Sequence, residues 1–143
     1  MPNHAPLRTR IHRLISGYLD GQPLTTDISA EPVAIRSGTA VVYVRLVEAT
    51  PPVVRVFSPL LRGIDQSQGL LEELNELNGR LSFLRVFWRD GTVFAASELL
   101  AETLTSAELA NSCDWLAEAA DYYDVRLRSR FGGQTAFAER RPS

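Results

Sequence analysis

The chain has 143 residues, of which 45% are hydrophobic and 22% are charged. This is typical of one globular domain and excludes a disordered or collagen-like protein. Its 15 basic and 17 acidic residues leave a formal charge of −2, so no overall field attracts nucleic acid or an anionic membrane. All the basic residues are arginine, which excludes a lysine base, a lysine Schiff base and a Walker-type phosphate lysine. With one cysteine and no apolar run of about 20 residues, we expect a cytoplasmic protein without disulfides.

The first predicted element is an amphipathic helix near the N-terminus. Pro6 suits its first turn, and residues 20–23 (DGQP) end it. We expect no secretory signal, because arginines interrupt any apolar stretch, but an arginine-rich and acid-poor start also describes a transit peptide. Those arginines are Arg8, Arg10 and Arg13. The helical spacing of the apolar residues favours a helix docked on the core, and these residues are Leu7, Ile11, Leu14 and Tyr18.

Three strands are expected next. Residues 33–36 (VAIR) form a short strand, which Pro32 restricts to an edge of the sheet. Residues 39–48 (TAVVYVRLVE) are dense in β-branched side chains and form the clearest strand of the chain. Residues 50–52 (TPP) turn the chain, and residues 53–57 (VVRVF) return as the third strand.

The second half alternates helices with a hairpin. Leucines at helical spacing predict a helix over 67–78, with Asn78-Gly79 as its left-handed stop. Strands are expected over 83–89 and 92–97, joined by the two-residue turn Asp90-Gly91. A capping box, Thr105 with Glu108, opens a last helix that runs to Phe131 and closes at Gly132-Gly133.

These elements predict an α+β fold in the order α-βββ-α-ββ-α. Links of about three residues between strands are too short for parallel crossovers. We therefore expect an antiparallel five-stranded sheet with the helices packed on one face. Residues 1–133 form a single domain in this interpretation, and residues 134–143 form a flexible C-terminal tail.

No catalytic, metal or cofactor site is expected. The histidines, His4 and His12, are interpreted as solvated surface residues, and Cys113 as a buried structural thiol on the apolar stripe of the last helix. The acidic residues of the 67–78 helix are interpreted as a solvated face, because nothing there would separate the pKa values of an acid and a base. No nucleophile elbow, zinc-protease motif or glycine-rich phosphate loop occurs.

Arginines alternate with aromatic residues on the predicted strands. Strand parity and the hairpin register place these side chains on one face of the sheet, opposite the leucine and valine face that meets the helices. This candidate partner-binding face comprises Tyr43, Arg45, Arg55, Phe57, Phe83, Arg85, Phe87, Arg89 and Phe94. Such residues are enriched at interfaces, although arginine stems can also simply cover exposed aromatics. On the last helix, Trp115 and Tyr122 form either a dimer flank or a widened core face.

Three stretches carry a family resemblance. They are VVRVFSPLLRGI at 53–64, LLEELNELNGRLSFLRVFWRDGTVFAASELLA at 70–101 and LRSRFGG at 127–133. Together they resemble the YbjN-like family, grouped with type III secretion chaperones of the CesT kind, and within it an actinobacterial branch of peptide-binding, chaperone-like modules. The resemblance implies a small non-enzymatic homodimer that holds an extended segment of a partner protein.

The leading hypothesis is a non-enzymatic module that binds an extended peptide or an unstructured segment of another protein. It expects a homodimer, no cofactor, no nucleic acid and no membrane. One alternative is a single-stranded RNA-binding sheet, because aromatics flanked by arginine can stack bases and hold phosphates. The other is a small-molecule sensor with a pocket between sheet and helices.

Overall fold

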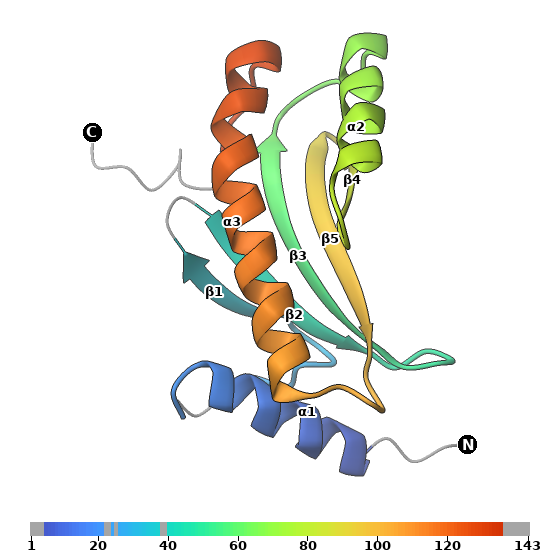
Figure 1. Ribbon diagram of the computed structural model, residues 1–143, viewed down its shortest axis with the longest axis vertical. Coiled ribbons are helices and arrows are strands. Elements are labelled where there is room, and N and C mark those ends of the chain that lie inside the picture. Colours follow the sequence, from blue (N-terminus) through green and yellow to red (C-terminus); the bar gives the residue numbers. More distant parts are fainter. Residues whose placement is uncertain (1–4, 22–23, 25, 38–39, 136–143) are drawn as a thin grey trace.

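In the computed structural model of the chain (Figure 1), residues 5–21, 24, 26–37 and 40–135 are described. They form the predicted order of elements, α-βββ-α-ββ-α. The elements are α1 (Ala5–Tyr18), β1 (Val33–Ser37), β2 (Ala40–Val47), β3 (Val53–Arg62), α2 (Gln68–Arg80), β4 (Arg85–Arg89), β5 (Thr92–Leu100) and α3 (Ser106–Phe131). The five strands pair in the order β1-β2-β3-β5-β4, with every pairing antiparallel. The predicted α+β fold is confirmed.

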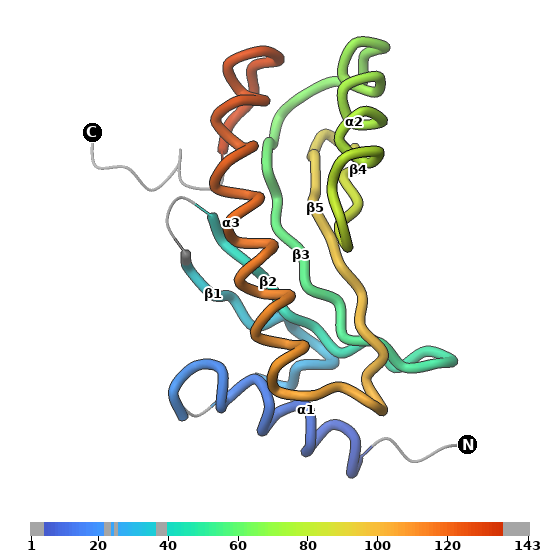
Figure 2. The backbone as a smooth tube through the Cα atoms, viewed as in Figure 1, coloured from blue at the N-terminus to red at the C-terminus, as the bar shows by residue number. Residues whose placement is uncertain are grey.

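The helices and one face of the sheet enclose the core. Figure 1 shows α3 running along the sheet and α1 lying across its lower end. Figure 2 traces β3 and β5 side by side, between α3 and α2 in this view. Ile11 of α1, Leu74 of α2 and Leu116 of α3 all join one buried cluster with the inward valines of the strands. The period-two alternation of the strands thus meets the helical stripes on a single side of the sheet.

Helix α1 is docked, as its spacing predicts. Ile11 and Ile15 are fully buried. The Arg10 guanidinium donates to the carbonyl oxygens of Ala101 (3.0 Å) and Leu104, in the link between β5 and α3. Charged donors on backbone acceptors are among the stronger hydrogen bonds. This packing favours the docked helix over the transit-peptide interpretation.

The predicted hairpin turn and the capping box of the last helix are confirmed. Asp90 (φ 49°) and Gly91 (φ 84°) both adopt the left-handed conformation of a two-residue hairpin turn, and Arg89 pairs with Thr92. Thr105 and Glu108 form the predicted capping box of α3.

Several boundaries differ from the prediction. Strands β3 and β5 continue to Arg62 and Leu100, beyond the expected ends at 57 and 97. The register of β3 against β5 shifts between Pro59 and Leu61. Proline has no backbone N–H, and such an irregularity in the pairing tolerates its absence. Helix α2 runs through Asn78-Gly79 to Arg80, so the predicted left-handed stop is wrong.

The end of α3 brings the chain back to β3. The backbones of Gln134 and Arg62 exchange hydrogen bonds of 2.8 and 2.9 Å. Gly133 permits this approach, because a Cβ at that position would lie 2.8 Å from the Arg62 oxygen. Within the tail expected over 134–143, Gln134 therefore pairs with β3 and Thr135 is buried. The rest of that expected tail lies outside the described residues.

Candidate functional site

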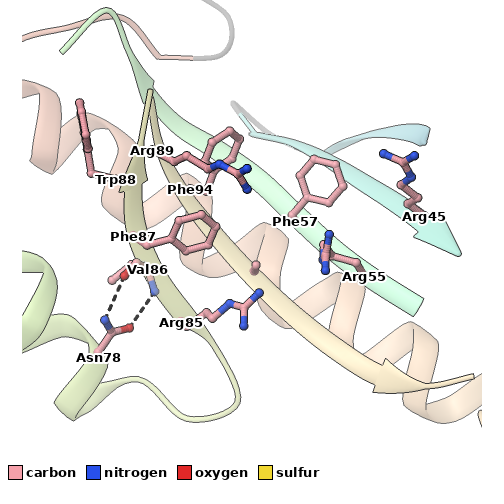
Figure 3. Close-up of a pocket in the computed structure, with 11 residues that line it drawn as sticks. Arg45, Arg55, Phe57, Asn78, Arg85, Val86, Phe87, Trp88, Arg89 and Phe94 are labelled. Carbon is pink, nitrogen blue, oxygen red and sulfur yellow. Dashed lines mark hydrogen bonds between the residues drawn. The ribbon is translucent and has the colours of Figure 1, made fainter. Parts of the chain in front are cut away.

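Four strands place arginine and aromatic side chains on the side of the sheet opposite the core. Successive side chains of a strand alternate between the two sides of the sheet. On β4, Val86 is buried on the core side, and Phe87, the next residue, points to the opposite side (Figure 3). Trp88 packs against the core and donates its indole N–H to the Ile64 oxygen at 2.8 Å. We call this surface the arginine–aromatic face, and it comprises Tyr43, Arg45, Arg55, Phe57, Arg85, Phe87, Arg89 and Phe94.

The aromatic rings of this face touch one another across the strands. Tyr43 stacks on Phe57 at a centroid distance of 5.4 Å, and Phe87 stacks on Phe94 at 5.6 Å. Phe57 and Phe94 meet edge to face at 6.5 Å, which joins the two pairs into one ladder over β2, β3, β5 and β4. Ring pairs of this geometry contribute about 0.5–1.5 kcal/mol each beyond their buried area. The ladder is therefore an ordered apolar surface that remains half-buried.

Guanidinium groups border the ladder. Arg45 and Arg55 are directly opposite each other on β2 and β3, and Arg55 is opposite Glu98 on β5. Glu98 accepts from Arg55 Nη2 (2.9 Å) and Nε (3.2 Å), and it forms an ion pair with Arg85 at 2.9 Å. Hydrogen bonding from Arg55, reinforced by the charge of Arg85, outweighs partial burial and lowers the pKa of Glu98 below its ordinary value. Glu98 is thus a carboxylate held between two guanidiniums.

The face is hollowed over β3, β5 and β4. The hollow measures about 580 Å³ and is lined by Arg55, Phe57, Arg85, Phe87 and Phe94, among others (Figure 3). Asn78 of α2 closes its outer edge, because its side-chain amide donates to the Val86 oxygen (2.9 Å) and accepts from the Val86 N–H (2.7 Å). The side chain thereby replaces a neighbouring strand on the outer edge of β4. An extended chain can lie over this hollow, but it cannot pair with β4 at Val86.

Phe83 is not part of this face, and the prediction that places it there is wrong. Strand β4 begins only at Arg85, and Phe83 adopts a left-handed backbone (φ 64°) with 90% of its surface exposed. It lines a separate hollow of about 530 Å³ with Leu99 and Trp115. The parity argument fails there because helix α2 extends two residues further than expected, which leaves the chain turning at Phe83 instead of running straight.

The predicted flank on α3 is exposed in part. Trp115 is 36% exposed and donates its indole N–H to the Ser82 oxygen at 2.8 Å. Tyr122 is 50% exposed, and the Arg126 guanidinium lies 3.7 Å from its ring centroid. Trp115 therefore also binds the link between α2 and β4, whereas Tyr122 faces outward with the Arg126 guanidinium over its ring.

Two residues of the site escape the sequence analysis. Glu98 shares the parity of Phe94, and extending the expected strand by one residue would have included it. Asn78 was assigned to the end of a helix, and nothing local in the sequence indicates that its amide reaches Val86. Both residues act through partners on other elements of the fold.

The metal-ligating and nucleophilic side chains of the described residues lie apart from this face. In residues 5–21, 24, 26–37 and 40–135, no group of three or more His, Cys, Asp or Glu side chains is placed to hold a metal ion. Cys113 is buried, and its burial raises the pKa of the thiol to about 12, so the thiolate is scarce at neutral pH. In the same part of the chain, no helix combines the length and the apolar character needed to cross a membrane.

A family model described as "T3SS (YopN, CesT) and YbjN peptide-binding chaperone 1" matches residues 5–139. The chain belongs to this family. The match confirms the resemblance carried by residues 53–133 and extends it over nearly the whole sequence. Membership makes the chain a peptide-binding chaperone. A comparison with curated protein sequences gives no match.

Solved structures agree with the family. The chaperone is similar to a chain in the ExsC–ExsE complex, with a TM-score of 0.65 and 19% identity over 83% of this chain and 94% of that one. A chain in the HopA1–SchA chaperone–effector complex gives a TM-score of 0.65 and 14% identity over 87% and 99%. A chain in the ExoT–SpcS complex from Pseudomonas aeruginosa gives 0.61 and 17% over 82% and 97%. At these identities the likenesses establish the fold.

Proposed function

We propose that the chain is a non-enzymatic chaperone that holds an extended, unstructured segment of a partner protein on the arginine–aromatic face. The observation that carries this proposal is the ladder of contacting rings on the side of the sheet opposite the core. Contiguous exposed apolar surface rimmed by polar groups marks interaction sites. The family description and the chaperone–effector complex among the similar structures support a polypeptide as the ligand.

The face suits a segment without fixed structure. A ring surface spanning four strands offers contact area to many side chains, so a binder need not match one sequence. Rings and guanidiniums that are already held by neighbours lose little conformational freedom on binding, which leaves more of the contact energy for affinity. The ladder contacts and the Glu98 ion pairs supply this ordering before a partner arrives.

The proposal includes a homodimer in the cytoplasm. Trp115 and Tyr122 form its candidate contact, because both rings are exposed on the outer side of α3. Sedimentation velocity over a hundredfold range of concentration measures the state of the chain. The double variant Trp115→Ala, Tyr122→Ala should shift a dimer toward monomer. A monomeric wild-type chain would overturn the dimer, and a dimer that persists unchanged in the variant would move its interface elsewhere.

Binding is tested with a fluorescein-labelled polypeptide that cannot fold, such as a reduced and carboxymethylated protein. Fluorescence anisotropy measures the affinity of the wild-type chain and of the double variant Phe87→Ala, Phe94→Ala. Because central aromatic residues dominate interface energies, we expect the double variant to bind at least about tenfold more weakly. Arg85→Glu is a second probe, since Arg85 is largely exposed and its replacement leaves the core intact.

The matched control is Phe83→Ala. This substitution removes a more exposed aromatic side chain that lines a different hollow. The Phe83→Ala variant should therefore bind the labelled polypeptide with the affinity of the wild type. Circular dichroism and thermal melts of each variant separate loss of binding from loss of folding. Equal affinity of wild type, the Phe87 and Phe94 double variant and Arg85→Glu would refute the arginine–aromatic face as the binding surface.

A further inference from the structure

We propose that the segment bound by this chaperone is acidic, with carboxylate side chains alternating with aromatic or aliphatic ones along an extended chain. This inference rests on the proposed function and adds the chemistry of the partner. Three observations support it: the positive charges on the arginine–aromatic face, the ion pairs of Glu98 with two of its arginines, and the arrangement of rings and guanidiniums across the strands.

The face carries an unbalanced positive charge. Its hollow is lined by Arg45, Arg55, Arg85 and Arg89, and no carboxylate lines it among the described residues. Glu98, at the border of the hollow, pairs with Arg55 and Arg85. For a chain with a net charge of −2, this is a local excess of the opposite sign. Such a surface attracts an anionic partner through its local field, although the whole molecule does not.

Arg45 and Arg55 sit directly opposite each other, which is an unfavourable cross-strand pair. Glu98 accepts hydrogen bonds from Arg55 and so offsets its charge. Arg45 has no ion pair in the described part of the chain, and its guanidinium donates there to the Ser29 carbonyl oxygen at 3.4 Å. Arg89 reaches no closer than 4.0 Å to the exposed carboxylate of Asp90. Two guanidiniums beside the ladder therefore offer charged donors that an external carboxylate can use.

Glu98 shows how a carboxylate fits among these arginines. Its two oxygens bind two guanidiniums from the flanking strands β3 and β4, at 2.9 Å each. A carboxylate of a bound segment next to Arg45 or Arg89 would make the same kind of contact. It could also compete with Glu98 for Arg55 or Arg85. Glu98 is thus an internal competitor that weakens binding and offsets the repulsion between Arg55 and Arg85 while the face is empty.

The ladder and its charged border run across the strands. The rings belong to four neighbouring strands. Arg45, Arg55 and Glu98 are cross-strand neighbours in one row over β2, β3 and β5. A segment that follows the ladder therefore crosses the strands and cannot hydrogen-bond with them as an added strand. Its recognition depends on side chains.

In an extended segment, successive side chains point to opposite sides. With its backbone between the rings and the row of Arg45 and Arg55, one set faces the rings and the other faces these two arginines, while Arg89 lies on the other side of the ladder. Alternate residues are about 6.6 Å apart and neighbouring strands about 4.8 Å apart, so three side chains on one side of the segment, spanning about 13 Å, cover the width of about 14 Å across the four strands. Alternation of acidic and apolar residues follows from this geometry.

The test uses three synthetic 12-residue peptides with phenylalanine at every second position. The intervening positions are glutamate in the first peptide, glutamine in the second and lysine in the third. Fluorescence anisotropy measures their affinities for the full chain at about 0.02 M and about 0.5 M salt, where screening differs strongly. We expect the glutamate peptide to bind about tenfold more tightly than the glutamine peptide at low salt, and the advantage to shrink at high salt. The lysine peptide should bind most weakly.

Two variants sharpen the test. Glu98→Gln frees Arg55 and Arg85, so it should tighten the glutamate peptide about three- to fivefold, the scale expected for two exposed ion pairs, without changing the glutamine peptide. The double reversal Arg55→Glu, Arg85→Glu should invert the preference toward the lysine peptide. Its matched control reverses two exposed arginines on helices, Arg80→Glu with Arg128→Glu, and should keep the wild-type preference because the net charge changes equally but off the face.

The outcomes separate the two proposals. Equal binding of the glutamate and glutamine peptides, lost in the Phe87 and Phe94 double variant, refutes the acidic partner and retains the binding face. If the helix control loses the preference for the glutamate peptide as completely as the double reversal on the face does, the charge effect does not originate on the face. Peptide binding that survives the Phe87 and Phe94 double variant refutes the proposed function itself. Tighter binding of a 12-residue oligouridine than of the glutamate peptide replaces the acidic peptide with single-stranded RNA.

Discussion

Replacing Asn78 tests how the edge of the binding face is held. Its amide makes two hydrogen bonds with the backbone of Val86, at 2.7 and 2.9 Å, on the outer edge of β4. Val86 is buried, so Asn78→Ala leaves a backbone N–H and a carbonyl without partners in a place that water reaches poorly. A hydrogen bond of this kind contributes about 1 kcal/mol, and an unsatisfied buried group costs more. We expect a loss of about 2–3 kcal/mol in the free energy of unfolding.

Helix α2 supplies a matched control. Asn75 lies three residues earlier, is exposed and forms no hydrogen bond with β4 in the described part of the chain. Asn75→Ala therefore makes the same substitution in the same helix without changing the edge of β4. Alanine is the better helix former, and Asn75→Ala should be neutral or slightly stabilising. Urea unfolding followed by circular dichroism gives both free energies. The difference between the two variants isolates the contacts with Val86.

Hydrogen exchange gives a second measurement at the site itself. In the wild type, the Val86 amide donates to Asn78 Oδ1, and it should exchange only through an opening of α2 or β4. In Asn78→Ala its protection should fall, while the amides of β3 keep theirs relative to global stability. Equal free energies for the two alanine variants, with unchanged protection at Val86, would refute the role of Asn78 as a substitute strand.

Other predictions test the docking of α1, the thiol and the charged border. Arg10→Ala should lower the free energy of unfolding by about 1 kcal/mol, because it removes charged donors from backbone oxygens of the β5–α3 link but the side chain is exposed to solvent. Urea unfolding of the exposed neighbour variant Arg13→Ala should show almost no change. Cys113 should not react with a thiol reagent at pH 8 until urea unfolds the chain, because its pKa is raised to about 12; fast stoichiometric labelling of the folded chain would contradict this. Since folding lowers the pKa of Glu98, its ion pairs stabilise the chain above the unfolded pKa and are lost as pH falls through the folded value. Thermal melts from pH 7 to pH 3 should therefore fall less steeply for Glu98→Gln than for the wild type, and parallel curves would contradict the assignment.

The sequence predicts most of the face because its signals are local and repeat along each strand. Period-two alternation places Tyr43 and Arg45 on one side of β2, and the Asp90-Gly91 turn sets Phe87 opposite Phe94. A two-residue turn admits one register, so the ring contact across the hairpin follows from the chain itself. The contact of Phe57 with Phe94 completes the ladder because β3 and β5 are neighbours, and strand order is a tertiary property.

The errors all occur where a contact with another element decides the local structure. Asn78-Gly79 is a common helix stop, yet the helix continues because the side chain of Asn78 bonds to Val86. The two added helical residues displace Phe83 from the strand. Glu98 lies beyond the expected end of β5, and pairing with the long strand β3 keeps that segment extended. Propensity alone cannot include such pairings.

The arrangement of charges explains why one surface can be ordered and still available for binding. A face of arginines without a carboxylate would repel itself across β2, β3 and β4, whereas a face with matched carboxylates would leave no charge for a partner. The observed face is intermediate between these two cases, because Glu98 bridges Arg55 and Arg85 while Arg45 remains opposite Arg55 without a carboxylate of its own. The rings add cohesion that does not depend on charge. The face therefore keeps its shape without a ligand while retaining a positive excess, and that excess is the property on which an acidic segment would depend.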